Sequence, residues 1–220
     1  MNIARRSTAI VAVAVIALVG ATAGPAFAAS DKQIAKASTL KASDLSGSGW
    51  TATPHEESKD STIPACAPTN KAGNAAQKYG AHSPDFSNTD GAKITNSVYV
   101  FPTVKQAKAY LAAYQLPTAL ECLQQGLDQT LEGTGATATV TELDVSGAPK
   151  GTFNDGVGYQ AVITAIPADQ GGGVDVYFEA VAFRTGRAVT GFTTNNPGAN
   201  YPETAQLVLK DIARLKKNLK

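Results

Sequence analysis

Cys66 and Cys122, the only two cysteines, are the clearest candidates for covalent chemistry in the sequence. A redox pair is typically spaced as Cys-x-x-Cys, and a nucleophilic thiol needs a histidine and an amide partner. Neither arrangement is visible. Two cysteines in an exported chain are expected to form a disulfide, and the leader described below predicts export. We therefore predict a structural Cys66–Cys122 bond between a proline-rich loop and a helix.

The two histidines, His55 and His82, are the next candidates, because imidazole is a metal ligand and an acid-base catalyst. Both lie in a polar segment in which Glu56, Glu57 or Asp85 could complete a metal site with them. Their separation matches no zinc spacing, so we predict no metal site and expect both rings to face solvent.

Two short motifs suggest catalysis or a cofactor. Ser38-Thr39-Leu40-Lys41 matches the Ser-x-x-Lys of penicillin-recognising enzymes, but no Ser-Asp-Asn follows it. The run 156–161 matches Gly-x-Gly-x-x-Ala, but it leads into an alternating strand rather than a helix. We predict no catalytic residues, no cofactor and no enzyme activity.

The N-terminal sequence predicts a signal peptide. Arg5 and Arg6 precede an apolar run at 9–19, and Ala26-Phe27-Ala28 is a small-x-small cleavage pattern. We predict that residues 1–28 are removed by cleavage after Ala28. Residues 29–220 then form a single secreted domain without a membrane span.

Composition narrows the class of partner. The 220 residues carry 19 Lys and Arg against 18 Asp and Glu, and 17% of residues are charged. A near-neutral chain lacks the basic surface that nucleic-acid binding requires, so we predict no nucleic-acid partner.

The elements that position these residues follow from periodicity. Helices are expected from 30, from 104 to 114, from 117 to 131 and from 202 to 219. Strands are expected at 50–53, 92–101, 137–145, 157–165, 174–182 and 187–194, and residues 54–92 are expected to be a long loop. Strands that are grouped apart from helices predict an α+β fold with an antiparallel sheet of about five to six strands and helices packed on it.

Bulky apolar residues occur at both sets of alternate positions along the strands, so both faces of the sheet carry them. Each face is therefore expected to be covered by other parts of the chain or by a ligand. Tyr99, Tyr177 and Phe183 lie on the phase opposite to the main apolar stripes. One explanation is a second layer of helix or loop over that face. The other is an open apolar groove, in which these three residues bind a ligand under the loop that precedes Cys66.

Several short motifs together resemble a known family. Leu40 to Leu45 is followed by Gly49-Trp50, a Cys-Ala-Pro loop at 66–68 and a strand that ends in Val100-Phe101-Pro102. This order is similar to the extracytoplasmic sensor domain of PknH-like mycobacterial serine/threonine kinases and to related exported sensor-domain lipoproteins. The resemblance implies a sheet with helices around a cleft for an extracellular ligand. This chain departs from it in having one possible disulfide and no kinase domain or lipobox. The broader Mog1/PsbP-like fold is the alternative.

We expect from these observations a secreted, non-catalytic ligand-binding or sensor-like module of the cell envelope. Its partner would be a small apolar or envelope-derived ligand, or another protein. The alternatives are a secreted cell-wall hydrolase and a protein-interaction module.

Overall fold

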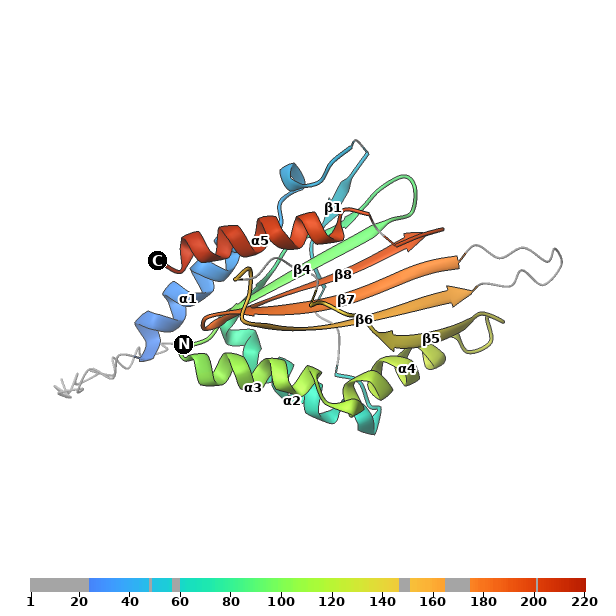
Figure 1. Ribbon diagram of the computed structural model, residues 1–220, viewed down its shortest axis with the longest axis horizontal. Coiled ribbons are helices and arrows are strands. Elements are labelled where there is room, and N and C mark those ends of the chain that lie inside the picture. Colours follow the sequence, from blue (N-terminus) through green and yellow to red (C-terminus); the bar gives the residue numbers. More distant parts are fainter. Residues whose placement is uncertain (1–23, 48, 57–59, 147–150, 165–174, 201) are drawn as a thin grey trace, which may run out of the picture.

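A meander of long antiparallel strands forms the centre of the fold. The computed structural model describes residues 24–220 except 48, 57–59, 147–150, 165–174 and 201. The long strands are β4 (Lys93–Val100), β5 (Thr137–Glu142), β6 (Asp155–Thr164), β7 (Asp175–Thr185) and β8 (Ala188–Pro197). Their order across the sheet is β4-β8-β7-β6-β5, and every neighbouring pair is antiparallel. The predicted α+β class with an antiparallel sheet is confirmed (Figure 1).

The sheet is larger than predicted, with eight strands among the described residues rather than five to six. Two short strands that were not predicted account for the difference: β2 (Gly80–His82) and β3 (Asp85–Ser87), which both pair with β4. The predicted strand at 50–53 is β1 (Thr51–Thr53), which pairs with β3. The segment 54–92 also contains α2 (Ala67–Ala76), between the short 3-10 helices Pro64–Cys66 and Gln77–Tyr79. The prediction of a long loop was wrong, because pairing with β4 orders strands too short and too polar to show a hydrophobic period.

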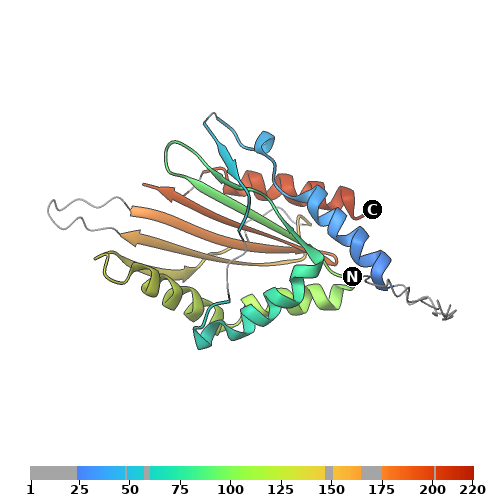
Figure 2. The same ribbon diagram turned by 180° about the vertical axis from the view of Figure 1, so that it is seen from behind.

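Helices cover both faces of the sheet, as Figures 1 and 2 show from opposite sides. Strand register assigns Thr95, Ser97 and Tyr99 of β4 to one face, which packs against α2, α3 (Val104–Tyr114) and α4 (Pro117–Leu131). We call this the α3/α4 face. Ile94, Asn96 and Val98 point to the other side, towards α1 (Gly24–Ser38) and α5 (Thr204–Asn218). We call that side the α1/α5 face.

Local sequence signals explain where the α3/α4-face helices begin. The Thr103 hydroxyl accepts a hydrogen bond from the Gln106 backbone N–H at 3.2 Å and so caps the N-terminus of α3. Pro117 occupies the first turn of α4, where its missing N–H costs nothing.

Gln124 of α4 covers the outer edge of β5. Its side-chain amide donates to the Ala138 carbonyl at 3.0 Å and accepts from the Val140 N–H at 2.8 Å. These are the backbone groups that a further strand would use, so Gln124 occupies part of an otherwise open sheet edge.

Helix α5 is amphipathic, and its apolar spacing predicts an inward stripe of Ala205, Val208, Leu209, Ile212 and Leu215. Val208, Ile212 and Leu215 are buried as predicted, and burial of each contributes about 1.5–3 kcal/mol, whereas Ala205 is exposed. Leu207 and Asp211 are also buried, whereas Leu209 is 39% exposed. The hydrophobic period could not show that the helix turns a carboxyl group inward.

Two sequence-based predictions fall wholly or mostly outside the described residues. The signal peptide lies outside them up to residue 23, and its predicted cleavage point after Ala28 lies within α1. The connection expected between the strands at 157–165 and 174–182 lies outside them entirely. Across the described part of the chain, no helix has both the length and the apolarity needed to span a bilayer.

Candidate functional site

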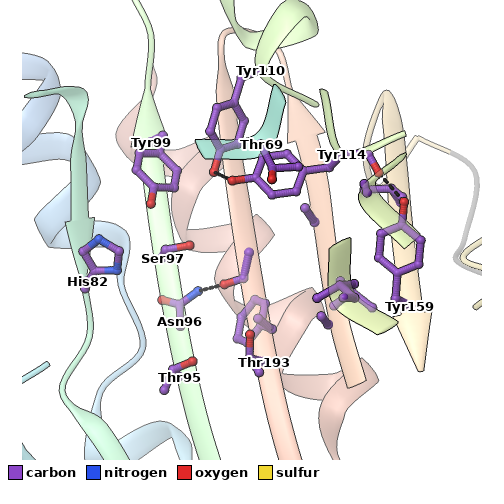
Figure 3. Close-up of a pocket in the computed structure, with 18 of the residues that line it drawn as sticks. Thr69, His82, Thr95, Asn96, Ser97, Tyr99, Tyr110, Tyr114, Tyr159 and Thr193 are labelled. Atoms are coloured by element: carbon purple, nitrogen blue, oxygen red, sulfur yellow. Dashed lines mark hydrogen bonds between the residues drawn. The ribbon is translucent and has the colours of Figure 1, made fainter. Parts of the chain in front are cut away.

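A cavity of about 470 Å³ lies between the α3/α4 face of the sheet and the helices above it. The sheet provides the floor, α3 and α4 provide most of the roof, and β2 closes one side (Figure 3). Its lining includes His55, Thr69, His82, Thr95, Ser97, Tyr99, Tyr110, Tyr114, Ala119, Cys122, Leu123, Val157, Tyr159, Phe178, Ala180, Ala182, Gly191 and Thr193. We call it the tyrosine cavity.

Small residues on the floor create the space. Ala180 and Ala182 of β7 and Gly191 of β8 lie in neighbouring register positions on the α3/α4 face. A Cβ atom at Gly191 would lie only 3.0 Å from the Ser97 hydroxyl oxygen. Larger side chains at these positions would fill the cavity, so its volume depends on this row of small residues.

Three tyrosines form the aromatic wall. The ring centroids of Tyr99 and Tyr110 lie 5.1 Å apart, as do those of Tyr110 and Tyr114. The Tyr110 hydroxyl donates to the Tyr114 hydroxyl at 3.4 Å, and Figure 3 shows these two groups pointing at each other. Burial raises the pKa of Tyr110 well above its usual value and also raises that of Tyr114. Both hydroxyls therefore stay protonated and uncharged near neutral pH.

Tyr159 of β6 connects the sheet floor of the cavity to its helical roof through a hydrogen bond. It is buried, and its hydroxyl donates to the Tyr114 carbonyl at the end of α3. Burial, together with the charge of Glu142, raises the pKa of its hydroxyl, which therefore remains a donor. The side chain connects the C-terminal end of α3 to β6.

The disulfide confirms the predicted Cys66–Cys122 pairing, with Cα atoms 4.8 Å apart. It joins α4 to the start of α2, and Cys122 itself contributes to the cavity wall. The Thr69 hydroxyl donates to the Cys66 carbonyl at 2.9 Å, which fixes the first turn of α2 beside the bond. The bond therefore holds two parts of the cavity roof together.

The two histidines lie together at one side of the cavity, which corrects the expectation that both face solvent. Their rings stack with centroids 4.3 Å apart and planes 16° from parallel. His55 Nδ1 lies 2.7 Å from an Asp85 carboxylate oxygen, and the edge of the His82 ring meets Tyr99 with centroids 5.9 Å apart. Both histidines are half-buried.

Close approach of β2 to β4 positions His82. A Cβ atom at Gly80 would lie 2.4 Å from the Tyr99 ring, so only glycine lets β2 pass over that ring. His82 follows two residues later on the same face, opposite Ser97.

Apart from the two histidines and the tyrosines, the described lining carries no ionisable side chain. Among the described residues, no Lys, Arg, Asp or Glu side chain lines the tyrosine cavity. Hydroxyl groups of Thr95, Ser97 and Thr193 provide the polar part of the floor. The arrangement suits a mostly apolar molecule that has a few hydrogen-bonding groups and no net charge.

The three predicted ligand-binding residues do not share a site. Tyr99 lines the tyrosine cavity. Tyr177 and Phe183 lie on the α1/α5 face, because Phe183 pairs with Thr190 and Tyr177 with Asn196. The prediction of one groove over all three was wrong, because alternation within a strand does not fix its register against its neighbour.

Sequence reasoning missed Tyr110, Tyr114 and Tyr159 as wall residues. Tyr110 and Tyr114 are four residues apart in a helix, which places them on one helical face, and this spacing was the available signal. Tyr159 is in phase with the apolar stripe of β6, where it resembles an ordinary core residue.

The remaining chemical candidates do not form sites. Ser38 is buried, and its hydroxyl accepts a hydrogen bond from Asn218 at 2.9 Å, while Lys41 is exposed. Within the described residues, no group of three or more His, Cys, Asp or Glu side chains is placed to bind a metal ion. The glycines at 156 and 158 lie within β6.

Comparison with known proteins finds a distant structural likeness to a solved structure. No family model and no curated protein matches the chain. A solved structure, the extracellular domain of PknH from Mycobacterium tuberculosis, resembles it with a TM-score of 0.48 and 15% sequence identity. The likeness covers 84% of this chain and 96% of that one. It is a likeness of overall layout alone.

Proposed function

We propose that this chain is an extracytoplasmic, non-catalytic binding module whose ligand occupies the tyrosine cavity. The ligand class is a small, mostly apolar, uncharged molecule with a polar end. The observation that carries the proposal is an aromatic-walled cavity of about 470 Å³ with no Lys, Arg, Asp or Glu side chain among its described lining residues. Such a volume falls within the range of small-molecule sites.

The lining suggests how the ligand lies. The apolar part would rest on Ala180 and Ala182 beneath the tyrosine rings. The polar end would face Ser97 and His82, whose hydroxyl and imidazole groups offer both donors and acceptors. The disulfide supports the extracytoplasmic part of the proposal, since such bonds persist in oxidising compartments.

A fluorescent, uncharged apolar probe, N-phenyl-1-naphthylamine, tests the site in the full disulfide-bonded chain. Ala180→Leu should lower its affinity by about tenfold or more, because the larger side chain takes up cavity volume. Ala213→Leu makes the same change on the exposed side of α5 and should leave binding unaltered. Tyr177→Ala should also leave it unaltered, since Tyr177 lies on the other face. Equal binding to the Ala180 and Ala213 variants would refute this site.

One observation favours a second candidate, a secreted cell-wall hydrolase. The Asp85 carboxylate beside His55 could orient that imidazole as an acid-base group at the cavity side. Peptidoglycan hydrolysis by the native chain, lost in both His55→Gln and His82→Gln, would support this candidate over the binding module.

A further inference from the structure

A second cavity, of about 370 Å³, lies on the α1/α5 face beside the start of α5. Most of its wall is apolar and comes from β7, from α5 and from residues 143–145 and 152–153, which lie between β5 and β6. The principal apolar residues are Leu143, Val145, Phe153, Phe183, Val208 and Leu209. We call it the phenylalanine cavity. The sheet separates it from the tyrosine cavity.

A buried carboxyl group lines this apolar cavity. Glu179 is only 8% exposed, and its Oε2 atom accepts hydrogen bonds from the Thr194 hydroxyl at 3.2 Å and the Thr204 hydroxyl at 2.9 Å. These two hydroxyls hold the carboxyl group in one place. No ion pair between described residues includes Glu179. A buried acidic group in this setting favours a positively charged partner.

The charges around the cavity have one sign. Glu179 and Asp144 both line it, and no Lys or Arg does so among the described residues. Thr204 is the first residue of α5, so the positive end of the helix dipole lies beside Glu179. That end is equivalent to about half an elementary charge, which leaves the cavity net negative.

The aromatic pair gives the cavity a second feature that suits a cation. The rings of Phe153 and Phe183 have centroids 4.6 Å apart and planes inclined by 45°. Aromatic ring faces attract an organic cation electrostatically and also pack against its apolar part.

We propose that the phenylalanine cavity is a second binding site, and that it takes a small apolar amine in its protonated form. The ammonium group would meet the Glu179 carboxyl group, and the apolar body would lie against Phe153, Phe183 and Val208. The site is independent of the ligand proposed for the tyrosine cavity, because it lies on the opposite face of the sheet.

Calorimetric titration of the full disulfide-bonded chain with 2-phenylethylammonium and with its neutral counterpart, 2-phenylethanol, tests the proposal. The ammonium should bind about tenfold more tightly than the alcohol. Glu179→Gln keeps the side-chain shape and should remove this preference. Glu121→Gln makes the same charge change on the exposed side of α4 and should keep the preference within about twofold.

A second variant protects the test against misfolding of the Glu179 variant. Ala205 is exposed at the rim of the cavity, so Ala205→Phe should narrow the entrance without disturbing the core. It should lower affinity for the ammonium by about tenfold or more while Glu179 is retained. Equal affinity for ammonium and alcohol, a preference that survives Glu179→Gln in a folded variant, or unchanged binding to Ala205→Phe would each overturn the proposal.

Discussion

Asp211 gives the most quantitative prediction, because it is a fully buried carboxyl group in the polar part of the α1/α5 face. It shares a hydrogen bond with the Thr190 hydroxyl, which also accepts from the Asn96 amide at 3.2 Å. Burial raises the pKa of Asp211 from its ordinary 3.8 to about 7. The hydrogen bond with Thr190 and the positive charge of Arg214 oppose this rise, whereas Asp44 adds to it.

The sign of the effect follows from the raised pKa. The native state holds the proton more tightly than the unfolded chain, so this contribution to stability is complete below pH 4 and is lost as the pH rises through 7. A shift from 3.8 to about 7 corresponds to about 4 kcal/mol in the free energy of unfolding. Between pH 5 and pH 8 the expected loss is about 3 kcal/mol.

Asp211→Asn removes the ionisation and keeps the side-chain shape. Urea unfolding at pH 5 and pH 8, without reductant, should show that the stability of this variant relative to the native chain rises by about 3 kcal/mol across that interval. Asp90→Asn, in an exposed turn, should show no such rise. A relative stability that is the same at both pH values, or that falls, would refute this account of the buried carboxyl group.

Two further predictions concern the roof of the tyrosine cavity. Replacing both Cys66 and Cys122 by serine should lower the free energy of unfolding by about 4 kcal/mol, as urea titration would measure, because the bond closes a long loop in the unfolded chain. A decrease in the free energy of unfolding of less than about 1 kcal/mol would contradict this stabilising role of the disulfide. Gln124→Ala uncovers the edge of β5 and should lower the free energy of unfolding by about 1–2 kcal/mol. The exposed edge should also make the variant associate at high concentration, which light scattering would detect. Gln125→Ala should show neither effect. A monomeric, equally stable Gln124 variant would show that the edge needs no cover.

The sequence predicted the elements that carry their own local signals. Helical periodicity located α3 and α4, and alternation located the five long strands. The leader at 1–28 and its cleavage after Ala28 remain predictions. The segment 54–92 was not resolved from sequence, because its short strands are held by partners distant along the chain.

The candidate site was predicted only in part. Tyr99 was identified correctly as a residue on the face opposite the main apolar stripe of β4, and it lines the cavity. The grouping with Tyr177 failed because the relative phase of two strands depends on their register. The stacking of His55 on His82 depends on how β2 passes Tyr99, which one sequence does not encode as a visible pattern.

Intermolecular NOEs from bound N-phenyl-1-naphthylamine to protein methyl groups test the central proposal most directly. We expect contacts to the methyl groups of Ala180, Ala182 and Val157, which line the tyrosine cavity. Contacts confined to methyl groups outside that cavity, such as those of Val208, would contradict it.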